Sequence, residues 1–188
     1  MVSNKEIQNV GSVLNNAERP LKERFRALFT LKGLGGPEAI SEMSKAFNDT
    51  SELLKHEVAY CLGQMGDPQA IPVLSEVLTD LKQEPIVRHE AGEALGAIGD
   101  VSVLQLLQRI RDEDQEEVVI DTCKLAVVRL EWIQGQGKVE EGTLSTNPYA
   151  STDPAPPATE SDPESLKVTL LNDDLELFKR YRAMFALR

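Results

Sequence analysis

RALFTLKGLGGPEAI at residues 26–40 is followed along the chain by two related segments, AYCLGQMGDPQAI at 59–71 and GEALGAIGDVSVL at 92–104. Each segment places a leucine at the matching apolar position, and these leucines are Leu31, Leu62 and Leu95. The repeat is therefore 31 to 33 residues long, because 62 − 31 is 31 and 95 − 62 is 33. A fixed period of this length is typical of arrays of helix pairs in which each unit buries its apolar face against its neighbour. The segments predict an all-α fold, an α-solenoid of antiparallel helix pairs.

The residues between the two helices of each unit favour helix ends. Gly35, Gly66 and Gly99 suit the position just after a helix. Pro37 and Pro68 suit the first turn of the next helix. We expect an N-terminal domain of four helix pairs at 1–134, with helices at 4–15, 21–33, 38–48, 52–65, 69–81, 86–98, 101–111 and 116–133.

The composition narrows the class of protein. The 188 residues carry a formal net charge of -11, and 27% of them are charged while only 5% are aromatic. Nucleic-acid binding normally uses a basic surface, so this balance argues against a nucleic-acid partner and makes a cationic partner easier to accommodate. The N-terminal stretch MVSNKEIQNV lacks the basic start and apolar run of a secretory signal, and no apolar run is long enough to cross a membrane. We expect a cytoplasmic protein.

Several apolar residues are expected in the core. Cys61 and Cys123 lie in apolar helical patterns, which favours buried free thiols over a disulfide or a thiolate metal site. Phe29, Met65 and Trp132 occur at helical spacing and are interpreted as core residues.

The composition changes after residue 134. Residues 135–163 are rich in Gly, Ser, Thr, Pro and acidic residues, which predicts a disordered linker because such a segment buries little apolar surface. ELFKRYRAMFALR at 176–188 then repeats PLKERFRALFTLK at 20–32. Residues 164–188 are therefore expected to begin a second repeat half that is truncated. The exposed apolar face of an unfinished helix favours self-association through the truncated end.

The chain has only two histidines, and each directly precedes a glutamate, in His56-Glu57 and His89-Glu90. Both pairs are expected near the start of the second helix of adjacent units. Neighbouring helices lie about 8–10 Å apart, so the two imidazoles can converge. Two imidazoles with one or two carboxylates suit non-haem iron, because two-His-one-carboxylate sites leave positions open for dioxygen and water. The lack of thiolate ligands argues against a structural zinc site.

A simpler interpretation is that each pair lies on the surface and that its glutamate complements the helix dipole. The fourth unit has Asp121 and Thr122 at the equivalent position. Because His-Glu is restricted to two units, a functional site is favoured over a structural requirement of every repeat. Glu93 and Tyr60 each follow a histidine by four residues, so they either line a pocket beside the metal or are ordinary residues of the inner face.

Four segments, RFRALFTLKGLGGPEAI, LLKHEVAYCLGQMGD, PIVRHEAGEALGAIGD and YRAMFALR, make the chain resemble the deoxyhypusine hydroxylase family. The resemblance covers essentially the whole chain. It implies HEAT repeats in two four-repeat halves and a di-iron centre of Fe(2+) bound by four His-Glu pairs. The N-terminal half would contribute His56, Glu57, His89 and Glu90 as metal ligands or their immediate neighbours. The resemblance also implies a monooxygenase that uses dioxygen to hydroxylate the deoxyhypusine side chain of a translation initiation/elongation factor, forming hypusine.

Half of that metal site is missing from this sequence. The offset between the two copies is 156 residues (176 − 20), so further His-Glu pairs would fall near positions 212 and 245, beyond residue 188. The resemblance therefore implies that this chain alone carries only half of the di-iron site. One alternative is a non-catalytic HEAT-repeat adaptor that holds a basic partner protein on an acidic concave face. Another is a mononuclear iron or zinc protein that uses only the four residues of the two pairs.

Overall fold

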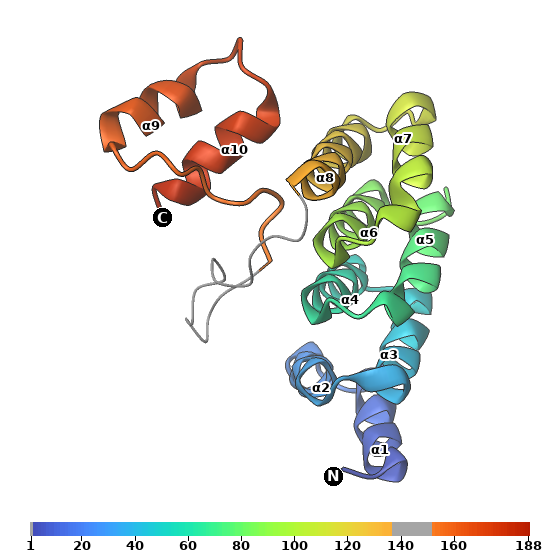
Figure 1. Ribbon diagram of the computed structural model, residues 1–188. Helices are drawn as coiled ribbons and strands as arrows, with labels where there is room; N and C mark the ends of the chain where they lie inside the picture. The colour runs from blue at the N-terminus through green and yellow to red at the C-terminus, as the bar shows by residue number, and fades with distance from the viewer. Residues whose placement is uncertain (1, 137–151) are drawn as a thin grey trace.

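The computed structural model describes residues 2–136 and 152–188. Within these ranges every regular element is an α-helix or a 3-10 helix. The helices between residues 4 and 136 stack in two layers (Figure 1), one formed by the first helices of the pairs and the other by the second helices. The all-α solenoid of antiparallel helix pairs predicted from the sequence is confirmed. None of the described helices is long and apolar enough to span a membrane.

Four helix pairs build the solenoid. The first helices are α1 (Asn4–Leu14), α3 (Gly36–Ser44), α5 (Ile71–Thr79) and α7 (Leu104–Glu113). The second helices, here called the second-helix layer, are α2 (Leu21–Leu34), α4 (Glu52–Met65), α6 (Pro85–Ile98) and α8 (Glu117–Gln136). Short 3-10 helices flank the first helices, and these are η1 (Lys45–Asn48), η2 (Pro68–Ala70) and η3 (Val101–Val103). All eight predicted helices are present, and the differences are confined to their ends.

The sequence sets α4 and α6, which carry the His-Glu pairs, to the same length of 14 residues. The Ser51 side chain accepts a hydrogen bond from the Leu54 N–H at the start of α4, and Pro85 begins α6. Gly66 and Gly99 follow the two helices with φ of 63° and 78°, a left-handed conformation that costs glycine little. Because the two helices begin and end in register, the two His-Glu pairs lie at the same level of the stack.

A continuous apolar core fills the space between the two layers. Its fully buried leucines are Leu14, Leu28, Leu31, Leu54, Leu62, Leu74, Leu78, Leu95, Leu107 and Leu130. Cys61 and Cys123 are buried free thiols, as predicted, and burial raises the pKa of both to about 12. The prediction that Phe29 is a core residue is wrong, because this side chain is 47% exposed. Phe29 lies at the position that Tyr60 and Glu93 occupy in the next two units. This position is on the face of the second-helix layer that points away from the first helices, here called the free face.

Close contacts between α4, α6 and α8 depend on two glycines. A Cβ atom added to Gly63 would lie 2.7 Å from the Cα atom of Ala94 on the next helix. A Cβ atom added to Gly96 would lie 2.8 Å from the Cβ atom of Ala126. These distances are shorter than van der Waals contact, so the three helices pack at a spacing that a larger side chain would increase.

Two buried arginines link the first helix pair to the second and the third helix pair to the fourth. Arg24 and Arg88 are 4% and 3% exposed, and their guanidinium groups bond the carboxylates of Asp49 and Asp114. In Arg24, Arg88 and Arg180 alike, Nε donates to the backbone carbonyl ten residues earlier in the chain. Arg180 in the C-terminal helices thus makes the same backbone contact as Arg24 and Arg88.

The C-terminal helices are α9 (Pro163–Leu171) and α10 (Leu177–Ala186), and they form an antiparallel pair beside α8 (Figure 1). A small apolar cluster of Leu125, Ala155 and Phe178 joins this pair to α8. The structure differs here from the predicted disordered linker at 135–163. Residues 152–162 make defined contacts, because their backbone groups find hydrogen-bond partners and Ala155 is fully buried. Residues 137–151 of the predicted linker lie outside the described residues.

Candidate metal centre

The two His-Glu pairs face each other across the neighbouring helices α4 and α6. His56 Nε2 lies 3.1 Å from Glu90 Oε2, so the histidine of the first pair contacts the carboxylate of the second. His56 Nδ1 lies 3.4 Å from Oε1 of its own neighbour Glu57. The Glu90 side chain is only 7% exposed, whereas those of His56 and Glu57 are each 26% exposed. The pairs therefore form a half-buried site on the free face of the second-helix layer.

A compact group of possible ligands lies on α6. One ligand atom each from His89, Glu90 and Glu93 lies within 4.8 Å of the other two. His89 and Glu90 belong to the predicted ligand set, and His56 reaches this group through its contact with Glu90. Glu93 was expected only as a pocket-lining or inner-face residue. Its spacing of four residues after His89 is the sequence signal that places it on the same side of the helix.

The next helix, α8, orients the second histidine. The Nδ1 atom of His89 hydrogen-bonds the hydroxyl oxygen of Thr122. Nε2 is then the nitrogen that remains available to a metal ion, and such outer contacts typically fix the ring of a ligating histidine. In the sequence, Asp121 and Thr122 stand where the two preceding units have His-Glu. The structure gives this residue a role in the site itself.

The electrostatic environment differs among the members of the site. The hydrogen bond to Glu90 raises the pKa of His56, although burial opposes this effect. Burial lowers the pKa of His89; the negative charge of Glu90 opposes this effect, and the nearby His56 adds to it. Burial also raises the pKa of Glu93 to about 7, with an added contribution from the negative charge of Glu90. The site therefore concentrates ionisable groups whose charged forms are costly unless a counter-charge is present.

The side chains present fit a metal ion that prefers nitrogen and oxygen ligands. Imidazole and carboxylate groups together suit iron, and also zinc or manganese. His56 Nδ1 is buried and makes no hydrogen bond of good geometry among the described residues, since its acidic neighbour Glu57 lies 3.4 Å away, and this is unusual for a buried polar atom. The free thiols of Cys61 and Cys123 are buried in the core, outside the group formed by His89, Glu90 and Glu93.

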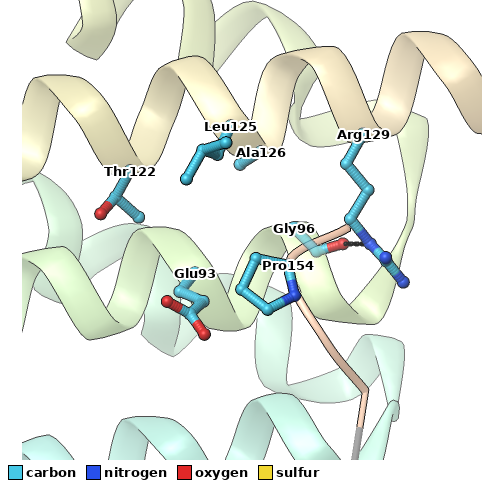
Figure 2. A pocket seen from close by; sticks show the side chains of 7 residues that line it. All are labelled: Glu93, Gly96, Thr122, Leu125, Ala126, Arg129 and Pro154. Carbon is cyan, nitrogen blue, oxygen red and sulfur yellow. Dashed lines mark hydrogen bonds between the residues drawn. The ribbon is translucent and has the colours of Figure 1, made fainter. Parts of the chain in front are cut away.

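A small pocket adjoins this group on the side of α8. Figure 2 shows the residues that line it, which are Glu93, Gly96, Thr122, Leu125, Ala126, Arg129 and Pro154. Glu93 and Thr122 connect the pocket to the candidate metal centre, while Leu125, Ala126 and Pro154 provide apolar walls. The pocket has a volume of about 10 Å³, which is room for about one water molecule beside the candidate ligands.

The fold and the site together define a HEAT-repeat protein with a candidate His-carboxylate metal centre. The family model of HEAT repeats matches residues 10–84, and the model of the PBS lyase HEAT-like repeat matches residues 87–112. The sequence is 58% identical over 188 residues to deoxyhypusine hydroxylase of Rattus norvegicus and 56% identical to that of Homo sapiens. In both comparisons the match covers 100% of this chain and 61% of the relative.

A solved structure of human deoxyhypusine hydroxylase in complex with glycerol superimposes on the chain with a TM-score of 0.92 and 55% sequence identity. That match covers 98% of this chain and 62% of the human chain. The protein is therefore a homologue of deoxyhypusine hydroxylase along its whole length, as the resemblance implied, and it spans about three fifths of the length of the curated relatives it matches.

Proposed function

We propose that the chain provides one half of the catalytic centre of a deoxyhypusine monooxygenase. The reaction is the iron- and dioxygen-dependent hydroxylation of a deoxyhypusine side chain on a translation factor, which forms hypusine. One observation carries this proposal: His56, His89 and Glu90 converge from neighbouring helices in a chain that is 56% to 58% identical to deoxyhypusine hydroxylases. We place the enzyme in the cytoplasm, because two reduced thiols are ordinary in that compartment.

Iron is the metal that the relatives' activity favours for this site. His56, Glu57, His89 and Glu90 would hold it, with Glu93 close enough to join them. When bound, iron supplies the redox chemistry that lets dioxygen insert an oxygen atom into a C–H bond. Thr122 keeps the His89 ring in place through Nδ1, and the burial of Glu90 limits the access of bulk water to the ligands.

The substrate that this site suits is a long aliphatic side chain that carries amines. Glu93 presents a carboxylate within the group of candidate ligand atoms, where it would pair with an amine of such a side chain. The net charge of -11 attracts a cationic side chain and a basic protein over a longer range. These features support a deoxyhypusine-bearing protein as the partner.

Iron content measured beside oligomeric state tests the proposal. Purified chain is loaded with Fe(II) without oxygen, and the iron retained per chain is compared among wild type, His56→Ala and His89→Ala. Glu76→Gln, which changes an exposed carboxylate on α5, serves as the control for unspecific effects of charge. We expect the wild type and the control to retain iron and both histidine variants to lose it. Equal iron retention in all four proteins would refute the assignment of the ligands.

A non-catalytic adaptor is the second candidate, and the net charge of -11 is the observation that favours it. An adaptor would hold a basic partner by charge alone, so His56→Ala and His89→Ala would leave the affinity for the partner unchanged. The monooxygenase predicts instead that hypusine formation is lost in both variants. Because this chain spans only part of the relatives' length, the assay places the same substitutions in a protein that includes the remaining repeats.

A further inference from the structure

Three exposed apolar side chains form a row across the second-helix layer. Leu53 on α4, Ile86 on α6 and Val118 on α8 occupy equivalent positions of consecutive units, because 86 − 53 is 33 and 118 − 86 is 32. Their exposed fractions are 57%, 45% and 40%. The three helices lie side by side (Figure 1), so these side chains gather in one patch, here called the apolar row.

The core does not require the apolar row. Each of its residues is followed by a second apolar residue, and these followers, Leu54, Val87 and Val119, are fully buried between the two layers. A single exposed apolar residue is ordinary on a protein surface. Three of them at one repeat position of neighbouring helices collect apolar surface in one place, which is typical of a site that binds another protein.

The apolar row lies beside the candidate metal centre. Leu53 precedes His56 by three residues, and Ile86 precedes His89 by three. Side chains three positions apart share one face of a helix, so the row is on the free face, about 4.5 Å nearer the N-terminal ends of the helices than the histidines are. A protein that contacts the row is therefore next to the candidate ligands.

The opposite end of the free face is covered by residues 152–157. The Gln64 side chain bonds both backbone groups of Thr152, at 2.8 and 3.0 Å, and Arg129 Nη1 donates to the carbonyl of the following residue at 2.8 Å. Gln64 is eight residues after His56, which is about 12 Å farther along α4. In the part of the chain that the structure describes, the end with the apolar row is thus the open approach to the candidate ligands.

Acidic side chains flank the apolar row. Each residue of the row follows an acidic residue by one or two positions, and these acidic residues are Glu52, Glu84 and Glu117. Glu84 and Glu117 are exposed, whereas Glu52 pairs with Lys55 at 3.1 Å. Carboxylates at a helix start also complement the helix dipole. Their charge beside an apolar patch complements a partner surface of apolar residues bordered by lysine or arginine.

A groove of about 560 Å³ adjoins the apolar row at the start of α6. Its lining includes Pro85, which directly precedes Ile86, and Leu81, which is 80% exposed. Four carboxylates and three basic groups line it, and one of each is used in the pair of Arg88 with Asp114. The groove offers a recess for a partner's side chain beside the row.

We propose that the apolar row, with Glu84 and Glu117 beside it, is the docking surface for the body of the substrate protein. The inference rests on the proposed function, because the substrate is taken to be the translation factor that bears deoxyhypusine. The factor places apolar residues bordered by basic ones on the row, and its modified side chain extends to the candidate ligands. The row thus sets the affinity for the whole protein, while the metal centre recognises the modification.

The first part of the test measures binding to the 188-residue chain. Leu53→Asn and Ile86→Asn are compared with wild type in their affinity for the translation factor, in its deoxyhypusine form and in its unmodified lysine form. We expect each variant to bind both forms about 10-fold more weakly, corresponding to about 1.4 kcal/mol, because an apolar contact of the interface is lost. The preference for the deoxyhypusine form and the Fe(II) retained per chain should stay as in wild type.

Val101→Asn is the matched control, because Val101 is 44% exposed, nearly the same as Ile86, but lies on η3, beyond the C-terminal end of α6. It should bind the factor like wild type. Glu84→Gln combined with Glu117→Gln should weaken binding at low salt and have little effect at high salt, since exposed charges are screened. Glu76→Gln should have no effect at either salt concentration.

The second part measures turnover in the protein that includes the remaining repeats. Ile86→Asn should raise KM for the factor about 10-fold at unchanged kcat, which is the signature of lost binding that is equal in the ground state and the transition state. A lower Tm with an unchanged KM would show that the remaining repeats cover the apolar row, and would overturn the inference.

Sedimentation of the 188-residue proteins tests a second copy as the occupant. A dimeric wild type and a monomeric Ile86→Asn would assign the apolar row to self-association and overturn the inference. Wild-type affinity for the factor in both Leu53→Asn and Ile86→Asn would also overturn it, while retained iron and a preference for the deoxyhypusine form would leave the proposed function in place. A wild type that retains no iron and shows no preference would instead overturn both.

Discussion

Replacing Gly63 with alanine should separate the two helices that carry the candidate ligands. The added Cβ atom would lie 2.7 Å from both the Cα and Cβ atoms of Ala94, whereas carbon atoms in contact are about 3.5–4.0 Å apart. Because Ala94 Cα belongs to the backbone, no rotamer change relieves the clash and α4 must move away from α6 by roughly 1 Å. Overpacking of this kind costs about 2–3 kcal/mol, and alanine regains about 1 kcal/mol of helix propensity.

The net loss of stability is therefore about 1–2 kcal/mol, which lowers Tm by roughly 2–8 °C for a chain of this size. The same displacement lengthens the 3.1 Å contact between His56 Nε2 and Glu90 Oε2, so we also expect iron affinity to fall at least about 10-fold.

Thermal unfolding of the metal-free chain and Fe(II) titration without oxygen measure the two effects separately. Gly33→Ala is the matched control, because Gly33 is also helical but nothing lies within 4 Å of its added Cβ atom. The control should be more stable than wild type, by up to about 1 kcal/mol, and should bind iron equally well. If Gly63→Ala were as stable as Gly33→Ala and kept its iron affinity, the close approach of α4 and α6 would not determine the site.

Three further predictions concern the scaffold and the site. Burial raises the pKa of Asp49 and Asp114, but the hydrogen bonds and positive charges of Arg24 and Arg88, together with hydrogen bonds from backbone N–H groups, outweigh it and hold both pKa values below the usual 3.8. The stability that these pairs provide is thus present above pH 3.8 and is lost as the pH falls further. Urea unfolding should show that this fall in pH lowers the free energy of unfolding less in Asp114→Asn than in wild type. Cys61 and Cys123, with a pKa of about 12, should not react with a disulfide reagent at pH 8 until the chain unfolds, and rapid labelling of native protein would contradict their burial. Thr122→Val removes the hydrogen bond to His89 and should weaken Fe(II) binding by about 10- to 100-fold, whereas Thr30→Val, an exposed change on α2, should not.

The sequence by itself determined the helical scaffold and the position along the helices at which the candidate ligands lie. The repeat of 31 to 33 residues fixed the helix pairs, because a pair of amphipathic helices must bury its apolar face against a neighbour of the same kind. Gly66 and Gly99 end α4 and α6 at matching places, so two His-Glu pairs separated by one repeat had to lie side by side. Phe29 shows the limit of periodicity, since helical spacing does not distinguish the core face from the free face of the layer.

Only the tertiary structure decided how the candidate site is completed. The contact of His56 with Glu90 rather than only with Glu57, and the hydrogen bond between His89 and Thr122, join residues about one repeat apart. The pairing of Gln64 with Thr152 joins residues 88 positions apart. Composition predicts that a segment like 152–157 stays disordered, because it buries little apolar surface of its own. Its order comes from hydrogen bonds that Gln64, Arg129 and Arg182 donate from three helices, and no local sequence pattern encodes partners at such distances.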